Sequence, residues 1–430
     1  MRKAILVLLF AASFSVLSAQ TAKEEITNNI RLSASNLLAY MGPQQLLTPA
    51  PEGMKPFYIS HYGRHGSRYL ANATEYDYPL NVLQHADSLG KLTPFGKSVL
   101  RRMKIIRKDA EGRLGDLTPL GAEQHRQIVR RMYGRFPEVF ADGAHIDAKS
   151  TTVVRCILSM SNALQELTSL SPRLRVTQDA SAHDMYYMNQ NDQVLWKLKT
   201  EMESAQPFVE FCKKHDCSAN LMQRLFNDPD YVTQELNPTR LNYNFFKVAS
   251  SIQNTELRRS LTLYDAYSDD DVYQNWLREN ARFYMGFAAS PLNGGTQPFS
   301  QRNLLRKIIT EADSCIHLNN PSASLRFGHE TMILPLVCLL GLDNFGLQTG
   351  DLEQLAKKGW CNYKIFPMAA NIQFVFYRRY PGDNDVVFKI LLNEDEATLP
   401  MKSDIAPYYH WNDFRDRYTK LLDAYAGQPW

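Results

Sequence analysis

KPFYISHYGRHGSR (residues 55–68) places a short apolar run directly before a loop that holds two arginines, a histidine and a glycine. The run has the length and composition of a buried strand, and the glycine marks the loop that follows it. Arg64, His65 and Arg68 carry like or potentially like charges, which repel one another unless an anion lies among them. Open α/β sheets bind ligands beyond the carboxyl ends of such strands. The stretch therefore predicts an α/β fold with an anion site at the end of this strand.

The residue types in this loop suit a phosphoryl group. Arginine presents a planar fork of N–H donors that matches phosphate oxygens, and Gly66 would let the backbone approach a ligand closely. A neutral imidazole held in one orientation can attack phosphorus and form a covalent intermediate. The alternative is a solvated basic loop, which the preceding apolar strand and the two flanking arginines disfavour. We therefore expect His65 at the floor of a phosphate site.

Strands and helices alternate along most of the chain. Residues 78–113 and 117–136 have a helical apolar period, and Pro119 suits the first turn of the second of these segments. Residues 144–170 repeat the order of strand, loop and helix, and residues 28–42 predict an earlier helix. Strand signals return in three late segments, residues 324–342, 369–380 and 385–400, the last as a hairpin or a strand and turn. This order predicts an α/β fold with a mostly parallel central sheet flanked by helices.

The middle of the chain has a different pattern. From residue 178 to residue 319 the strand signals vanish, and the sequence predicts a run of helices with polar faces. We expect residues 20–177 and 320–430 to form the α/β core and residues 178–319 to form an inserted α-helical domain. Such an insertion would roof the site and set the choice of substrate.

The first twenty residues, MRKAILVLLFAASFSVLSAQ, predict a secretory signal peptide. Arg2 and Lys3 precede an apolar stretch with a small-residue exit, and we expect cleavage after Ala19. The stretch is too short for a membrane span, and no later run reaches the ~18 apolar residues that a span needs. The net charge of +3 gives no global field that favours binding to nucleic acid or a membrane. We expect an exported, soluble protein, periplasmic or secreted, whose oligomeric state the sequence does not indicate.

Six cysteines follow the signal segment, at positions 156, 212, 217, 315, 338 and 361. An exported location permits disulfides, but the sequence does not choose among the possible pairings. Cys212 and Cys217 are close enough in sequence to pair across a turn. The sequence does not decide between this disulfide and two free thiols. Cys156 and Cys338 lie in apolar segments and are expected to be buried thiols. None of the spacings is that of a zinc site.

Four segments together resemble the histidine phosphatase superfamily in its acid phosphatase branch. RHGSR (64–68) is similar to the family's Arg-His-Gly-x-Arg signature, and LTPLGAEQH (117–125) is similar to its Leu-Thr-x-x-Gly-x-x-Gln turn and helix. STTVVRCILSMSNAL (150–164) resembles the segment that supplies a third phosphate-binding arginine. RFGHETMILPL (326–336) resembles the segment with a late histidine and an acidic proton donor. The C-terminal half is most similar to the multiple inositol polyphosphate phosphatase subgroup.

The resemblance implies roles for six residues and an α/β phosphatase core with an inserted helical domain. His65 would attack the phosphoryl group to form a phosphohistidine, and Glu330 would protonate the leaving oxygen. The phosphoryl oxygens would be bound by Arg64, Arg68, Arg155 and His329. No metal or other cofactor is expected, because the arginines would neutralise the charge that Mg²⁺ otherwise neutralises.

Two positions depart from the family's pattern. Leu70 stands where a proline often follows the second arginine by two residues, and we expect only a small change in loop stiffness. The subgroup usually reads His-Ala-Glu at the late motif, whereas this chain reads His329-Glu330-Thr331. The carboxylate therefore stands one position earlier, where the wider branch has Asp. With one methylene more than Asp, Glu330 would reach the leaving oxygen by a different path.

Other polar residues near these motifs have weaker claims on the site. His61, His125 and Tyr69 are expected to support or pack the fold rather than to react. The basic runs at residues 101–108 and 171–176 are candidates for binding a highly anionic substrate, although such runs are usually solvated faces.

The leading hypothesis is an exported phosphomonoesterase that hydrolyses inositol polyphosphates such as phytate. One alternative is a broad-specificity histidine acid phosphatase acting on other phosphomonoesters. Another is a non-catalytic protein that only binds phosphorylated ligands, which the intact set of six residues disfavours. A phosphoglycerate mutase would share the chemistry, but a signal peptide disfavours a glycolytic role.

Overall fold

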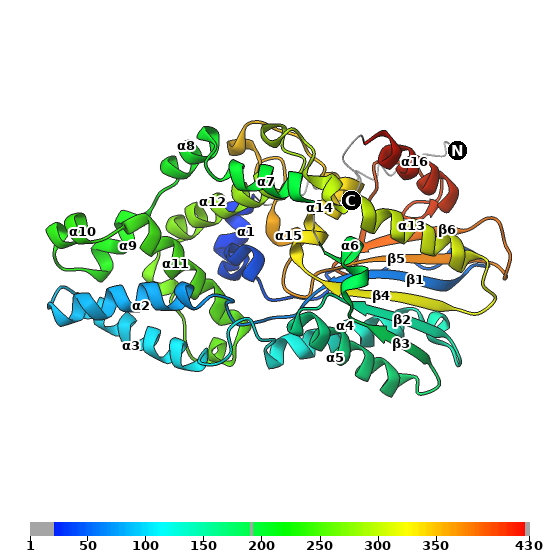
Figure 1. Ribbon diagram of the computed structural model, residues 1–430, viewed down its shortest axis with the longest axis horizontal. Helices are drawn as coiled ribbons and strands as arrows, with labels where there is room; N and C mark the ends of the chain where they lie inside the picture. The colour runs from blue at the N-terminus through cyan, green and yellow to red at the C-terminus, as the bar shows by residue number, and fades with distance from the viewer. Residues whose placement is uncertain (1–20, 190–191, 426–430) are drawn as a thin grey trace, which may run out of the picture.

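The computed structural model describes residues 21–189 and 192–425 and is built around one sheet (Figure 1). The predicted signal peptide lies outside the described residues. The sheet has eight strands in the order β3-β2-β4-β1-β5-β6-β7, with β8 paired to β6. The strands are β1 (Lys55–Arg64), β2 (His145–Ser150), β3 (Arg175–Asp179), β4 (Ser322–Gly328), β5 (Asn371–Arg378), β6 (Val387–Leu392), β7 (Asp395–Ala397) and β8 (Tyr409–His410).

The strand directions are mixed, which corrects the expectation of a mostly parallel sheet. β3, β2, β4 and β1 pair in parallel, whereas the pairs β1–β5, β5–β6, β6–β7 and β6–β8 are antiparallel. Short connections allow only antiparallel pairing, and β6 and β7 are joined through Asn393 and Glu394, both at positive φ. The predicted hairpin in residues 385–400 is thereby confirmed.

Helices cover both faces of the sheet and extend beyond one edge of it. They are α1 (Ala22–Asn28), α2 (Ala73–Ser88), α3 (Pro94–Asp109), α4 (Pro119–Arg135), α5 (Val154–Leu170), α6 (Met185–Met188), α7 (Gln193–Met202), α8 (Gln206–Lys214), α9 (Ser218–Leu225), α10 (Pro229–Glu235), α11 (Pro238–Ser251), α12 (Asp269–Phe287), α13 (Arg302–Ile316), α14 (Glu330–Leu340), α15 (Asn362–Ile365) and α16 (Trp411–Ala424). The α/β class with flanking helices is confirmed.

Alternate residues of β1 belong to cores on opposite faces of the sheet. Tyr58 and Tyr62 pack in the cluster that contains α13, α14 and α16. Ile59 packs in the cluster that contains α4 and α5. Figure 1 shows these two groups of helices above and below the strands. Because successive side chains of a strand point to opposite faces, β1 is buried on both sides and holds a fixed register.

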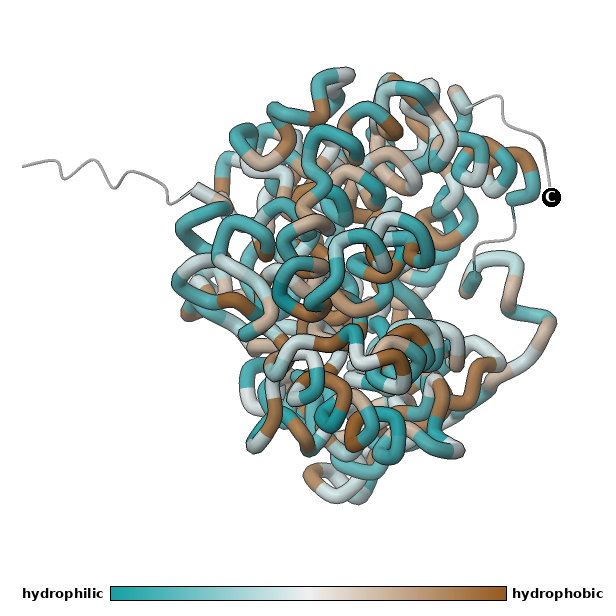
Figure 2. The backbone as a smooth tube through the Cα atoms, turned by 90° about the vertical axis from the view of Figure 1, so that its left-hand side faces the viewer, coloured by the Kyte–Doolittle hydropathy of each residue, from teal (hydrophilic) through white to brown (hydrophobic). Residues whose placement is uncertain are grey.

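The helical part of the molecule includes helices from outside the predicted insertion. Its core joins α9, α11 and α12 with α2, α3 and the segment at residues 22–38, which precede β1 or follow it directly. Conversely, α13 lies inside the predicted insertion but packs on the sheet. Figure 2 views this helical end, where hydrophilic and hydrophobic stretches alternate along the tube, as expected for amphipathic helices.

Two local predictions were wrong in type. Residues 28–42 were expected to form a helix, but α1 ends at Asn28 and a 3₁₀ segment, η1 (Ile30–Leu37), follows it with a break at Ser35. In residues 324–342 the strand ends at Gly328, and the apolar run after it is the helix α14. A run that is apolar on all sides fits a buried helix as well as a buried strand, so periodicity does not separate them.

All six cysteines lie within the described residues and are free thiols. The possible Cys212–Cys217 disulfide is therefore not formed. Cys156 and Cys338 are buried, as predicted. Across the described ranges, the helices are all too short or too polar to cross a membrane.

The parallel pairing of β1 with β4 brings two chain segments together at one edge. Arg64, the last residue of β1, lies opposite Gly328, the last residue of β4. Gly66 was expected to allow close approach of a ligand, but a Cβ at this position would overlap the backbone of Gly121 in α4. The glycine therefore lets the loop pack against the first turn of α4, and the loop is held from behind.

We expect Gly121→Ala to damage both stability and the loop. A methyl group at position 121 would overlap the Ser67 carbonyl oxygen, which belongs to backbone and cannot move aside cheaply. Overpacking of this kind costs about 1–3 kcal/mol in the free energy of unfolding, measured by urea denaturation. Gly134→Ala in the same helix is the control, because open space surrounds Gly134 and alanine favours a helix by up to about 1 kcal/mol. Equal stability of the two variants would contradict the packing described.

Candidate active site

The six residues expected at the site come from three segments that meet at the ends of β1 and β4. Arg64 ends β1, and His65 and Arg68 lie in the loop after it. Arg155 lies in the first turn of α5. The last two, His329 and Glu330, are the N-cap and the first residue of α14. The ring centroids of His65 and His329 are 5.6 Å apart.

The backbone of His65 is held by the neighbouring chain on both sides. Its N–H donates to Gly328 O at 2.9 Å, and its carbonyl accepts from Ala369 N at 2.9 Å. The ring nitrogen Nδ1 lies 2.9 Å from Gly66 O. A carbonyl only accepts, so Nδ1 carries the proton and the lone pair of the neutral ring is on Nε2. Nε2 is buried and has no hydrogen-bond partner among the described residues.

Buried donors of the three arginines also lack partners. Arg64 is fully buried and donates from Nη1 to Phe366 O at 2.8 Å, but its Nη2 makes no hydrogen bond within the described chain. The Nε atoms of Arg68 and Arg155 are likewise without an acceptor there. Buried polar groups are nearly always paired, so a set of unmatched donors indicates a site for an anion.

The orientation of His329 follows from its contact with Arg155. Arg155 Nη2 lies 3.3 Å from His329 Nε2, and a guanidinium has only donors. His329 Nε2 therefore accepts, and the proton of the neutral ring is on Nδ1. That atom is also buried without a partner in the described residues. His329 thus adds one more N–H donor to those of the arginines.

The arginines control the protonation of the two histidines. Burial, followed by the charges of Arg64, Arg68, Arg155 and His329, lowers the pKa of His65 well below 6.5. Burial and the nearby arginines also lower the pKa of His329 to about 4, although Glu330 opposes this shift. Both imidazoles are therefore neutral at neutral pH, which is the form in which His65 Nε2 is a nucleophile.

Glu330 faces the same cluster and is not a surface carboxylate. Its side chain is 14% exposed, and Oε2 lies 3.0 Å from Arg64 Nε and 3.9 Å from His65 Nε2. Burial by itself raises the pKa of Glu330, but the charges of Arg64 and Arg68 outweigh burial and hold it at about 2. Glu330 is therefore ionised in the empty site.

The LTPLGAEQH segment supports the loop from behind, a role that the sequence did not reveal. Ser67 N donates to Gln124 Oε1 at 2.9 Å, and Gln124 Nε2 donates back to Ser67 Oγ at 2.9 Å. Ser67 Oγ also donates to Asn254 Oδ1 at 2.7 Å. Gln124 lies in a motif that the sequence had already singled out, whereas nothing in the sequence marked Asn254.

The other polar residues that the sequence placed near these motifs pack in the fold or form ion pairs. His61 and His125 are buried against Phe327, and burial lowers the pKa of each to about 3. Tyr69 is buried, with the guanidinium of Arg113 5.0 Å from its ring. The basic runs lie away from the cluster, and several of their charges form ion pairs, including Arg102–Asp265, Arg107–Asp77 and Arg173–Asp142.

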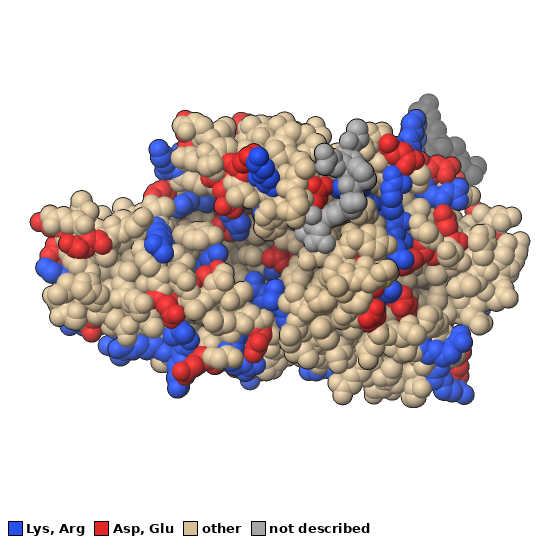
Figure 3. Space-filling model, in the orientation of Figure 1, with Lys and Arg blue, Asp and Glu red and all other residues tan. Residues whose placement is uncertain are grey.

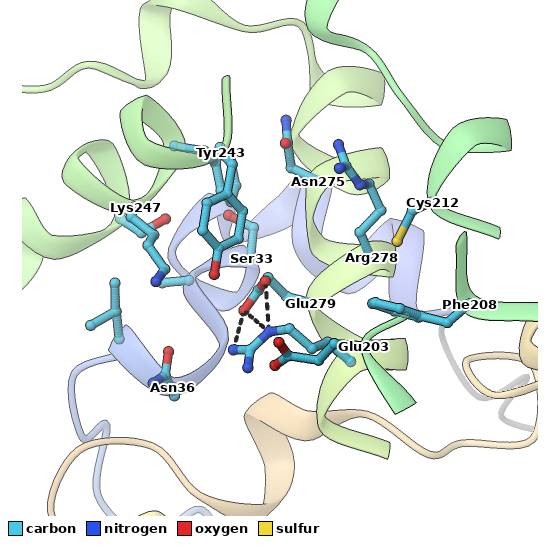
Figure 4. Close-up of a pocket in the computed structure, with 15 residues that line it drawn as sticks. Ser33, Asn36, Glu203, Phe208, Cys212, Tyr243, Lys247, Asn275, Arg278 and Glu279 are labelled. Carbon is cyan, nitrogen blue, oxygen red and sulfur yellow. Dashed lines mark hydrogen bonds and ion pairs between the residues drawn. The ribbon is translucent and has the colours of Figure 1, made fainter. Parts of the chain in front are cut away.

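A cavity of about 350 Å³ adjoins the cluster at Asn36 (Figure 4). Basic and acidic side chains line it together, among them Lys247, Arg282 and Glu279. Arg282 donates to Glu279 at 2.8 Å, and Lys247 pairs with Glu75 at 2.9 Å. Figure 3 shows the hollow between the helical part and the sheet, with charges of both signs along it. The described residues hold no cluster of ligands that could bind a metal ion.

Comparisons with known proteins agree on one family. The model of the histidine phosphatase superfamily, branch 2, matches residues 63–393. Multiple inositol polyphosphate phosphatase 1 of Gallus gallus is 22% identical over 398 residues, which cover 86% of this chain and 84% of that protein. Among solved structures, Bifidobacterium longum multiple inositol polyphosphate phosphatase in complex with inositol hexasulfate has a TM-score of 0.73 at 17% identity, covering 90% of this chain and 97% of that one. The phytase from D. castellii has a TM-score of 0.71 at 14% identity, covering 97% and 91%.

We expect His65 and His329 to be neutral at pH 5.5 in the free protein. A pKa below 6.5 means that each ring takes up its proton only when the pH falls past that lower value, which is about 4 for His329 and well under 6.5 for His65. ¹⁵N chemical shifts of labelled histidine rings, assigned with His65→Gln and His329→Gln variants, measure this. Unfolded protein, whose histidines titrate near ~6.5, is the reference. A midpoint between pH 6 and 7 for His65 would contradict the electrostatics described.

Proposed function

Because the chain belongs to branch 2 of the histidine phosphatase superfamily, we propose that it hydrolyses phosphate monoesters through a phosphohistidine at His65. The observation that carries this proposal is the set of buried polar atoms around His65 Nε2 that have no hydrogen-bond partner among the described residues. Donors on Arg64, Arg68, Arg155 and His329 match the oxygens of a phosphoryl group. Charge spreads over those oxygens in the transition state, where fixed donors stabilise it most.

The proposed reaction has two displacements at phosphorus. In the first, His65 Nε2 forms a bond to phosphorus while the ester P–O bond breaks, and the departing oxygen takes the proton of Glu330. In the second, water attacks the phosphohistidine, Glu330 accepts a proton from that water, and the bond between Nε2 and phosphorus breaks. Inorganic phosphate leaves, and both residues return to their starting forms.

Substrate binding would prepare Glu330 for the first step. In the empty site Arg64 and Arg68 keep its pKa at about 2, so it carries no proton to donate. A phosphoryl group neutralises these guanidinium charges and adds negative charge nearby, and both effects raise the pKa of the carboxyl. The proton arrives with a singly protonated phosphate ester or is taken up from solvent when the ester binds.

We further propose that the substrates are inositol polyphosphates such as phytate. The curated relative from Gallus gallus is named a multiple inositol polyphosphate phosphatase, and the B. longum structure of similar fold holds inositol hexasulfate. A cavity next to the phosphate site, lined by cations such as Lys247 and Arg282 together with acids such as Glu279, offers space for the rest of such a substrate. Faster phosphate release from phytate than from a simple aryl phosphate would separate this function from a broad acid phosphatase. Export by the predicted signal peptide is part of the proposal.

We expect His65→Ala to lower phosphate release from phytate by at least roughly 10³-fold, because the residue that attacks phosphorus is gone. The variant should keep its fold by circular dichroism. Rapid acid-free quenching of the wild-type protein with ³²P-labelled substrate should yield a base-stable, acid-labile label that His65→Ala lacks. His85→Ala is the matched control, since His85 is exposed on α2. Unchanged turnover in His65→Ala would end the covalent mechanism.

We expect Glu330→Gln to slow the ester with the poorer leaving group more. An alkoxide needs a proton to depart, whereas an activated aryl oxide does not, so phytate turnover should fall by about 10²-fold or more. For p-nitrophenyl phosphate kcat/KM should fall much less than for phytate, because kcat/KM reports the first displacement and not the second one, which both esters share. Glu52→Gln is the control, because Glu52 is exposed before β1. An equal loss of kcat/KM on both esters would show that Glu330 is not the acid.

A further inference from the structure

Asn36 is the one described side chain outside the six expected residues that hydrogen-bonds the Glu330 carboxylate. Its Nδ2 lies 3.4 Å from Glu330 Oε1, although 294 residues separate the two in sequence. The other oxygen, Oε2, faces Arg64 Nε at 3.0 Å and His65 Nε2 at 3.9 Å. The two carboxylate oxygens of Glu330 therefore have different partners. Oε2 is paired with the guanidinium of Arg64, and Oε1 accepts from the neutral amide of Asn36.

The chain on both sides of Asn36 is fixed by hydrogen bonds from other segments. Ser35 has φ 56° and ψ −122°, a strained conformation for any residue other than glycine. Such strain persists only where surrounding contacts hold it. Four contacts do so: Asn362 Nδ2 to Ser35 Oγ at 2.8 Å, Asn254 Nδ2 to Leu37 O at 2.7 Å, Met368 N to Leu38 O at 2.7 Å and Ala39 N to Gln253 Oε1 at 3.1 Å.

One of these contacts also reaches the loop of the nucleophile. The amide of Asn254 is fully buried, and while its Nδ2 holds Leu37 O, its Oδ1 accepts from Ser67 Oγ at 2.7 Å. A single side chain therefore fixes the segment of Asn36 relative to the loop that carries His65. The backbone that presents Asn36 to Glu330 is thereby tied to the loop of the proposed nucleophile.

A primary amide suits a carboxyl group that changes protonation state. Nδ2 donates to Oε1 of the ionised carboxylate, and because a carboxyl oxygen that carries a proton still accepts, the same N–H can stay on Oε1 while the carboxyl proton points to the leaving oxygen. A hydrogen bond to the ionised form also lowers the pKa of the acid. We propose that Asn36 is a positioning residue that holds Glu330 Oε1 toward the leaving oxygen in both states. This inference rests on the proposed role of Glu330 as proton donor.

The position of Asn36 agrees with this role. It lies at the edge of the cavity next to the cluster, on the N-terminal segment and facing the labelled side chains of α11 and α12 (Figure 4). The phosphoryl group would lie among the arginines on one side of Asn36, and the rest of the substrate would lie in the cavity on the other. The bond that breaks joins these two parts, so the leaving oxygen would pass beside Asn36 and Glu330.

The test compares Asn36→Ala with wild type on glycerol phosphate, which has a poor leaving group, and on p-nitrophenyl phosphate. We expect kcat/KM for glycerol phosphate, which reports the first displacement, to fall roughly tenfold or more, with less than a threefold change for the aryl ester. Asn244→Ala is the matched control, because Asn244 on α11 neither lines the cavity nor contacts Glu330. Thermal unfolding of all variants checks that they fold.

The pH profile supplies a second readout that a merely structural role would not move. Without the amide donor the pKa of Glu330 rises, so the acid stays protonated to higher pH. The alkaline limb of kcat for glycerol phosphate should therefore shift upward in Asn36→Ala, and further in Asn36→Asp, where a second carboxylate repels the first. An unmoved limb, or an equal loss on both esters, would overturn the role of Asn36.

Glu330→Gln in the same assays separates the two hypotheses. If it slows glycerol phosphate selectively while Asn36→Ala does not, the inference about Asn36 fails and the proposed acid stands. If Glu330→Gln lowers kcat/KM for both esters equally, the proposed acid itself fails, and the inference about Asn36 fails with it.

Discussion

The site depends on the mutual repulsion of Arg64, Arg68 and Arg155, which the fold holds around one imidazole. Each of these cations lowers the pKa of His65, and Arg68 and Arg155 also lower the pKa of Arg64. Glu330 supplies one negative charge against three positive ones, so an excess of positive charge remains where a phosphoryl group would lie. The charges that attract an anion therefore also keep the imidazole neutral. In the proposed reaction, burial and the same cations that would bind the phosphoryl group together keep His65 in its nucleophilic form.

The mixed sheet explains how such a repulsive arrangement is held in place. β1 is a central strand with a parallel neighbour, β4, on one side and an antiparallel neighbour, β5, on the other. Just beyond the ends of these strands, His65 N donates to Gly328 O, and Ala369 N donates to His65 O. Both partners are backbone groups, so the position of the imidazole does not depend on any mobile side chain. The antiparallel half of the sheet, which the sequence did not predict, is therefore what holds the second side of His65.

The sequence predicted which side chains the fold brings together better than it predicted their surroundings. Arg64, His65 and Arg68 stand in one pentapeptide, and the segments of Arg155, His329 and Glu330 were recognisable by resemblance. Gly66 was correctly singled out as a position of close approach, but the group that approaches it is the backbone of Gly121 and not a ligand. A glycine in a sequence indicates close packing without identifying the neighbouring group. Asn36 could not have been found, since its contact requires a 3₁₀ segment broken at Ser35 and a helix that begins 294 residues later.

The arginine charges that help to keep His65 neutral also keep Glu330 ionised. In the proposed reaction the bound substrate removes this second effect. A carboxyl with a pKa of about 2 has no proton to give at neutral pH, so the empty site is not ready for catalysis. Once a phosphoryl group occupies the donors, the guanidinium charges are matched and the carboxyl can hold a proton. When the leaving oxygen carries that proton away, Glu330 is again a carboxylate, which is the form that activates water for the second step. Glu330 therefore leaves the first displacement as the base for the second, and the neutral amide of Asn36 suits both of its forms.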